Sequence, residues 1–67
     1  MKCRFFFKHE NELCEFEFLK GTILSEILLL KDVIPDTVII LKDNISVPED
    51  MEAEEADYVV LTTSSRG

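Results

Sequence analysis

The side chains that could perform acid–base, nucleophilic or metal chemistry are one histidine, two cysteines and fourteen acidic residues. The histidine, His9, falls in a predicted hairpin loop, where an exposed imidazole is the usual outcome. Neither Cys3 nor Cys14 has a neighbouring histidine or a C-x-x-C partner. The chain also lacks a glycine-rich phosphate loop and any metal-ligand spacing. Because an enzyme needs titratable groups that converge in a concave site, we expect no catalytic residues, no metal and no cofactor.

The charge of the chain restricts its partners. The formal net charge is −7, whereas binding to a phosphate backbone requires clustered lysine and arginine. We therefore expect no nucleic acid as a direct partner. No apolar run approaches the roughly 20 residues that span a bilayer. The aromatic run Phe5–Phe7 lies between Arg4 and Lys8 and is not typical of a signal segment. These features predict no membrane association and a soluble cytoplasmic protein.

Most of the acidic charge near the C-terminus is concentrated in one segment. Six of the nine residues from Glu49 to Asp57 are acidic. Two interpretations are open. A solvated loop that aids solubility is the usual role of such a run, and a docking strip for a basic partner surface is the alternative.

The elements that would position these residues begin with a β-hairpin. Hydrophobicity alternates with period two over residues 2–8 and 13–19, which predicts two strands joined by a loop over 9–12. Placing Lys8 opposite Leu13 pairs Phe7 with Cys14, Phe5 with Phe16, Cys3 with Phe18 and Arg4 with Glu17. The two cysteines then lie on one face but not opposite each other, so two reduced thiols are expected.

A single helix and three further strands follow. Thr22 is a suitable N-cap, and the apolar spacing predicts a helix of about ten residues that ends near Asp32. Pro35 disfavours helical geometry at the residue before it. Strands are expected at 37–41, 45–47 and 58–63, which gives the order ββαβββ. The fold class is therefore α+β, with a sheet of four to five strands packed on one helix. Residues 1–67 form one domain, with a loose tail from about residue 64.

Sheet alternation divides the strand residues between a core face and an open face. The predicted core comprises Phe5, Phe7, Phe16, Phe18, Ile27, Leu28, Val59 and Leu61. The predicted outward-facing residues are Phe6, Ile39, Leu41, Tyr58 and Val60. Several apolar side chains on one sheet face favour a protein-docking surface. Ordinary strand residues partly covered by their neighbours are the alternative interpretation.

The second half of the chain resembles a known family. Several features of the chain resemble the ThiS/MoaD sulfur carriers. They are the element order, Thr22 at the helix start, Val47-Pro48-Glu49-Asp50, Asp57 before the last strand, and the glycine end. Residues 37–67 resemble the archaeal ubiquitin-like small modifiers more closely. The resemblance implies a β-grasp, or ubiquitin-like, fold.

The resemblance also implies a function for the C-terminal tail. Gly67 would be adenylated by an E1-like activating enzyme of the ThiF/MoeB type and then thiocarboxylated or joined to a lysine. Ser65 and Arg66 would form the tail that enters that enzyme. The further partners would be a sulfur-accepting synthase or lysine-bearing target proteins. Two positions depart from the family pattern, because Arg66 replaces a glycine and Ala56 replaces the glycine before Asp57. The alternative function is a non-catalytic β-grasp binding module with an inactive tail.

Overall fold

The structure, a computed structural model, describes residues 1–62. These residues form a small α+β arrangement with one α-helix and a mixed five-stranded sheet. The elements are β1 (Lys2–Phe7), β2 (Glu12–Glu17), α1 (Leu24–Leu30), the 3-10 helix η1 (Pro35–Thr37), β3 (Val38–Lys42), β4 (Ile45–Val47) and β5 (Asp57–Thr62). The order differs from the predicted ββαβββ by η1, which forms where Pro35 sets the first helical position after an extended Ile34.

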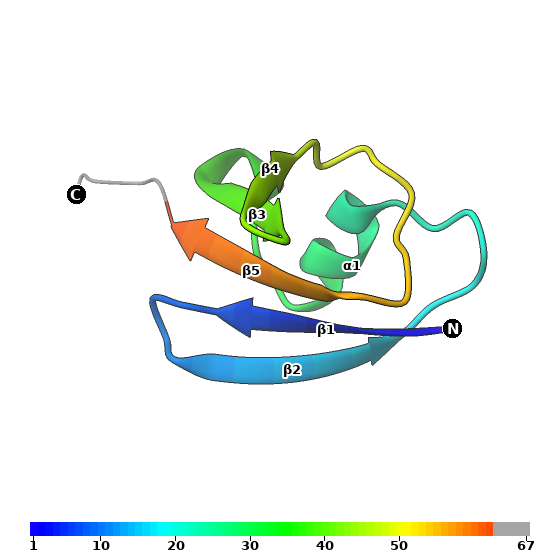
Figure 1. The fold of residues 1–67 in the computed structure, drawn as a ribbon, viewed down its shortest axis with the longest axis horizontal. Coiled ribbons are helices and arrows are strands. Elements are labelled where there is room, and N and C mark those ends of the chain that lie inside the picture. Colours follow the sequence, from blue (N-terminus) through cyan, green and yellow to red (C-terminus); the bar gives the residue numbers. More distant parts are fainter. Residues whose placement is uncertain (63–67) are drawn as a thin grey trace.

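The first and last strands meet in the middle of the sheet. The strand order is β2-β1-β5-β3-β4, with β1 parallel to β5 and every other neighbouring pair antiparallel. Figure 1 shows β5 lying between β1 and β3, with α1 to one side of the strands. This topology leaves β2 and β4 as the two sheet edges.

The hairpin forms in a register two residues away from the predicted one. Phe5 lies opposite Cys14, and Cys3 lies opposite Phe16. The loop closes one residue earlier at each end, because Asn11 adopts a φ of +54° and its N–H donates a hydrogen bond to the Lys8 carbonyl. Asparagine tolerates this left-handed geometry. An even shift leaves every side chain on its predicted face, although every predicted cross-strand partner is wrong.

Helix α1 begins one residue later than predicted and ends two residues earlier. Its N-cap is Ile23, not Thr22, and the Ile23 N–H donates to the Glu26 side chain. Asp32 adopts a φ of +62°, and the N–H groups of Asp32 and Val33 donate to the Leu29 and Leu28 carbonyls, respectively. This Schellman arrangement ends the helix before Pro35 can disfavour it. Within residues 1–62, no helix is long and apolar enough to cross a membrane.

The connection between β3 and β4 is a tight hairpin. Asp43 and Asn44 both have positive φ, +54° and +65°, which is the geometry of the two-residue turn that matches strand twist. The turn places Lys42 opposite Ile45 and Ile40 opposite Val47.

The core lies between α1 and one face of the sheet. Its buried members are Cys3, Phe5, Phe7, Phe18, Leu24, Ile27, Leu28, Ile40, Ala53, Tyr58 and Val60. Two predicted core residues, Val59 and Leu61, are therefore placed wrongly, whereas Phe16 lies on its predicted face and packs against the core. Phe16 is only partly buried, because β2 is an edge strand, and Val59 and Leu61 lie on the opposite face from Tyr58 and Val60.

Candidate functional site

The open face is the sheet face that points away from α1. The cross-strand registers place Leu13 beside Phe6, Phe6 beside Val59, and Val59 beside Leu41, so one apolar row crosses four strands. Leu61 and Ile39 form a second, shorter row. Leu13 is 58% exposed and Ile39 is 41% exposed, whereas the other four are partly buried by their neighbours. The open face therefore carries six apolar side chains, two of them exposed and four partly covered.

Three of the predicted face residues, Phe6, Ile39 and Leu41, lie there, but Tyr58 and Val60 do not. These two are 1% and 2% exposed and belong to the core. The Tyr58 ring lies 5.1 Å from the Phe5 ring, centroid to centroid. Burial raises the pKa of its phenol, and the phenol oxygen accepts a hydrogen bond from the Glu54 N–H. The face assignment of β5 was therefore inverted, and Val59 and Leu61 take the two places.

A polar residue at the start of β5 indicates which face of this strand points outward. The run from Tyr58 to Leu61 is apolar at every position, so alternation within it identifies neither face. Asp57 begins the strand, is exposed and lies opposite Arg4. Successive strand residues point to opposite faces, so an outward Asp57 requires Val59 to point outward as well.

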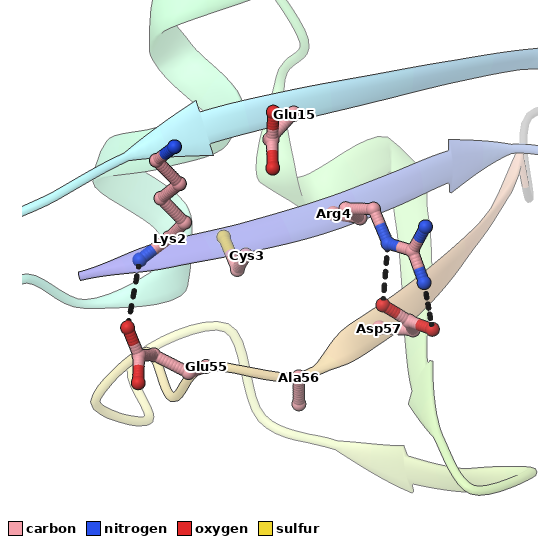
Figure 2. A pocket seen from close by; sticks show the side chains of 7 residues that line it. All are labelled: Lys2, Cys3, Arg4, Glu15, Glu55, Ala56 and Asp57. Atoms are coloured by element: carbon pink, nitrogen blue, oxygen red, sulfur yellow. Dashed lines mark hydrogen bonds and ion pairs between the residues drawn. The ribbon is translucent and has the colours of Figure 1, made fainter.

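Charged residues occupy the end of the open face nearest the start of β1. Figure 2 shows the surface cavity there, of about 290 Å³, which Lys2, Arg4 and Glu15 line together with Cys3 and residues 55–57. Arg4 holds Asp57 through two hydrogen bonds, Nε to Oδ1 at 2.9 Å and Nη2 to Oδ2 at 2.8 Å. These bonds are the main cause that lowers the pKa of Asp57. The cavity is lined largely by groups that already have partners within the chain, such as this ion pair.

Three of the six acidic side chains between Glu49 and Asp57 contact other parts of the fold, namely those of Glu54, Glu55 and Asp57. Glu54 forms an ion pair with Lys42 at 2.7 Å, and the Lys2 N–H donates to Glu55 Oε2 at 3.2 Å. Glu49 differs, because its Oε1 is buried and has no hydrogen-bond partner among residues 1–62. Five of the six acidic residues in the stretch are exposed, so most of its charge is solvated although parts of its backbone are hydrogen-bonded to the rest of the fold.

The thiols and the histidine lie apart from one another. Cys3 and Cys14 are free, and burial raises the pKa of the Cys3 thiol to about 11. Such a thiol is almost entirely protonated near neutral pH and is a poor nucleophile. His9 is exposed in the β1–β2 loop. Among residues 1–62, no three His, Cys, Asp or Glu side chains are placed to hold a metal ion.

The predicted tail residues Ser65, Arg66 and Gly67 lie outside the described residues. Each apolar row of the open face includes one residue of β5, and this strand ends at Thr62, five residues before Gly67. No protein-family model matches the chain, and no curated protein matches it.

Proposed function

We propose that this chain is a ubiquitin-like sulfur carrier or protein modifier with a β-grasp fold. The observation that carries the proposal is the position of β5. This strand pairs with both β1 and β3, presents Val59 and Leu61 on the open face, and leads in the sequence directly to the glycine end. A partner enzyme that holds the open face would thus bind beside the point where the tail begins.

The chemistry would take place in the partner, an E1-like activating enzyme. A carboxylate oxygen of Gly67 attacks the α-phosphorus of ATP, pyrophosphate leaves, and an acyl-adenylate forms. A hydrosulfide equivalent then attacks the acyl carbon and displaces AMP, which leaves a thiocarboxylate. Alternatively, the amine of a target lysine attacks the same acyl carbon, displaces AMP, loses a proton and forms an amide. Glycine suits a narrow enzyme channel because it has no Cβ to collide with the walls.

The fold would supply recognition and not reactivity. Cys3 is unsuited to nucleophilic catalysis, since it is buried and the pKa of its thiol is raised. A carrier must be recognised by its partner and must present a reactive end. A folded body with an apolar face and a separate tail would provide both. A downstream synthase or a lysine-bearing target would then receive the activated tail.

The test is the intact mass of the protein after incubation with an E1-like enzyme of the ThiF/MoeB type, ATP and a sulfide source. We expect a gain equal to the exchange of one oxygen for sulfur, and no gain after deletion of Gly67. Leu41→Asp should also reduce the rate of ATP–pyrophosphate exchange, because a carboxylate in a desolvated interface is costly. Arg66→Gly should accelerate exchange if the guanidinium impedes entry to the channel.

A plain binding module is the second candidate, and the apolar rows of the open face favour it. In that case a partner would bind the full chain and a chain truncated after Thr62 equally well. No mass gain with an enzyme that activates another carrier, together with tail-independent binding, would replace the carrier proposal by this one.

A further inference from the structure

A second surface cavity lies at the opposite end of the sheet from the one in Figure 2. It has a volume of about 270 Å³ and is formed where η1 leads into β3 and where β4 leads into the acidic stretch. Its apolar lining includes Val38, Ile40 and Val47, and its charged lining consists of Asp36 and Glu49. The volume is below the usual range for small-molecule sites, which favours a single side chain as the occupant.

Glu49 is the unusual member of this lining. Its Oε1 is buried without a hydrogen-bond partner among residues 1–62, and no other buried side-chain oxygen or nitrogen in that range is in this state. Its backbone is fixed, because the Glu49 carbonyl accepts a hydrogen bond from the Ser25 N–H at 2.8 Å. Folded proteins leave few buried polar atoms unpaired, because each carries a desolvation penalty. A donor that reached this oxygen would remove that penalty.

We propose that this cavity receives the side chain of an arginine from a partner protein. The apolar walls suit the methylene stem, and the two carboxylates suit a cationic head that carries several N–H donors. The net charge of −7 also attracts a basic partner before contact. Arginine is preferred over lysine because its planar guanidinium carries several N–H donors in a fixed fork, whereas the lysine ammonium is a compact, strongly hydrated point charge. The site requires neither Gly67 nor its activation, so it is independent of the proposed carrier function.

The experiment is a titration of the ¹⁵N-labelled full chain with N-acetyl-arginine amide, followed by amide NMR shifts. We expect saturable shifts centred on Val38, Ile40 and Val47, with a dissociation constant on the order of millimolar. The neutral isostere N-acetyl-citrulline amide should bind about tenfold more weakly, because the charge-assisted hydrogen bonds are lost. Equal binding of the two probes would overturn the proposal.

Two variants test whether the Glu49 carboxylate is the group that binds the arginine probe. Glu49→Gln should weaken arginine binding about tenfold, whereas Asp50→Asn should leave it unchanged. Asp50 is the matched control, because it is the exposed neighbour and its replacement removes the same charge. In the unmutated protein, the Glu49 side-chain carboxyl carbon should also shift on saturation, which keeps the test valid if Glu49→Gln fails to fold. An unshifted carboxyl carbon, or equal weakening by Asp50→Asn, would overturn the proposal.

Two other occupants are distinguished by the same method. Tighter binding of putrescine than of the arginine probe would assign the cavity to a free polyamine. Changes at Val38 and Val47 caused by Arg66→Gln in the free protein would assign it to the chain's own tail. Either result would overturn the assignment to a partner protein, whereas weak putrescine binding and an unperturbed Arg66→Gln spectrum would support it.

Discussion

The backbone N–H of Glu54 donates a hydrogen bond to the phenol oxygen of Tyr58 at 3.0 Å. This contact joins the acidic stretch to the strand that follows it. The Tyr58 ring itself packs against Phe5 in the core. One side chain therefore both fixes which face of β5 is buried and holds the preceding loop over the edge of the core.

Tyr58→Phe should retain the ring packing and remove the hydrogen bond. We expect a loss of about 1 kcal/mol in the free energy of unfolding, since the Glu54 N–H would remain partly buried without its acceptor. Amide hydrogen exchange at Glu54 should accelerate in parallel. Exchange in β1 should accelerate only as much as the loss of global stability requires. Unchanged exchange at Glu54 would show that the bond does not order the loop.

Two phenylalanines that contact each other should differ in their contribution to stability. Phe5 is fully buried and lies within 6.2 Å of three other rings, whereas Phe16 is partly buried on an edge strand. Phe5→Ala should cost about 3–5 kcal/mol, and Phe16→Ala distinctly less. Urea denaturation of both variants gives the comparison. Equal losses would mean that β2 is covered more fully than the structure indicates.

Neighbouring valines on β5 test the corrected face assignment. Val60→Asp would bury a carboxylate in the core and should unfold the domain. Val59→Asp places the same group on the open face and should preserve the fold. Circular dichroism and thermal melting of the pair are sufficient. A folded Val60→Asp variant beside an unfolded Val59→Asp variant would restore the assignment made from the sequence.

The two thiols should react at different rates with iodoacetamide near neutral pH. Cys14 is partly exposed and should be alkylated first, whereas Cys3 is buried with a raised thiol pKa. Mass spectrometry of a time course identifies the order of modification. Faster modification of Cys3 would contradict its burial beneath α1.

The raised pKa of Cys3 also predicts an alkaline loss of stability. The unfolded thiol ionises around its ordinary value of 9.0, and the folded thiol around 11. The folded state therefore keeps a proton that the unfolded state has lost, so this contribution is present below pH 9 and declines between pH 9 and 11. Tyr58 contributes in the same direction, because the pKa of its phenol is raised too. Urea melts of Cys3→Ala across this range should show a shallower decline than the unmutated protein.

Element types were predictable from the sequence, but cross-strand partners were not. Alternation assigned the correct faces of β1 and β2, because Arg4 and Lys8 lie on the face opposite Phe5 and Phe7, and Glu15 and Glu17 on the face opposite Cys14 and Phe16. The register depended on where the hairpin loop closes, and the left-handed geometry of Asn11 decided that. A shift of two residues leaves the hydrophobic pattern unchanged, so burial alone could not have detected it.

The candidate site was predictable only in part, for a related reason. Phe6 was placed on the open face because Arg4 and Lys8 share its side of the alternation, whereas the apolar runs in β3 and β5 offered no such contrast. The pairing of Asp57 with Arg4 marks the outward face of that strand, and the two residues are far apart in the sequence. The cavity beside Glu49 depends on where η1, β3 and β4 meet, which no local pattern encodes.

The central position of β5 has a consequence for how the chain folds. β5 is the last strand in the described sequence, yet it fills the gap between β1 and β3. During synthesis the β1–β2 and β3–β4 hairpins can form locally, but they cannot join into one sheet until residues 57–62 have emerged. Such distant pairings slow folding relative to domains built from local contacts. The nascent chain would thus expose its aromatic hairpin until the final strand arrives, which makes early contact with a chaperone advantageous.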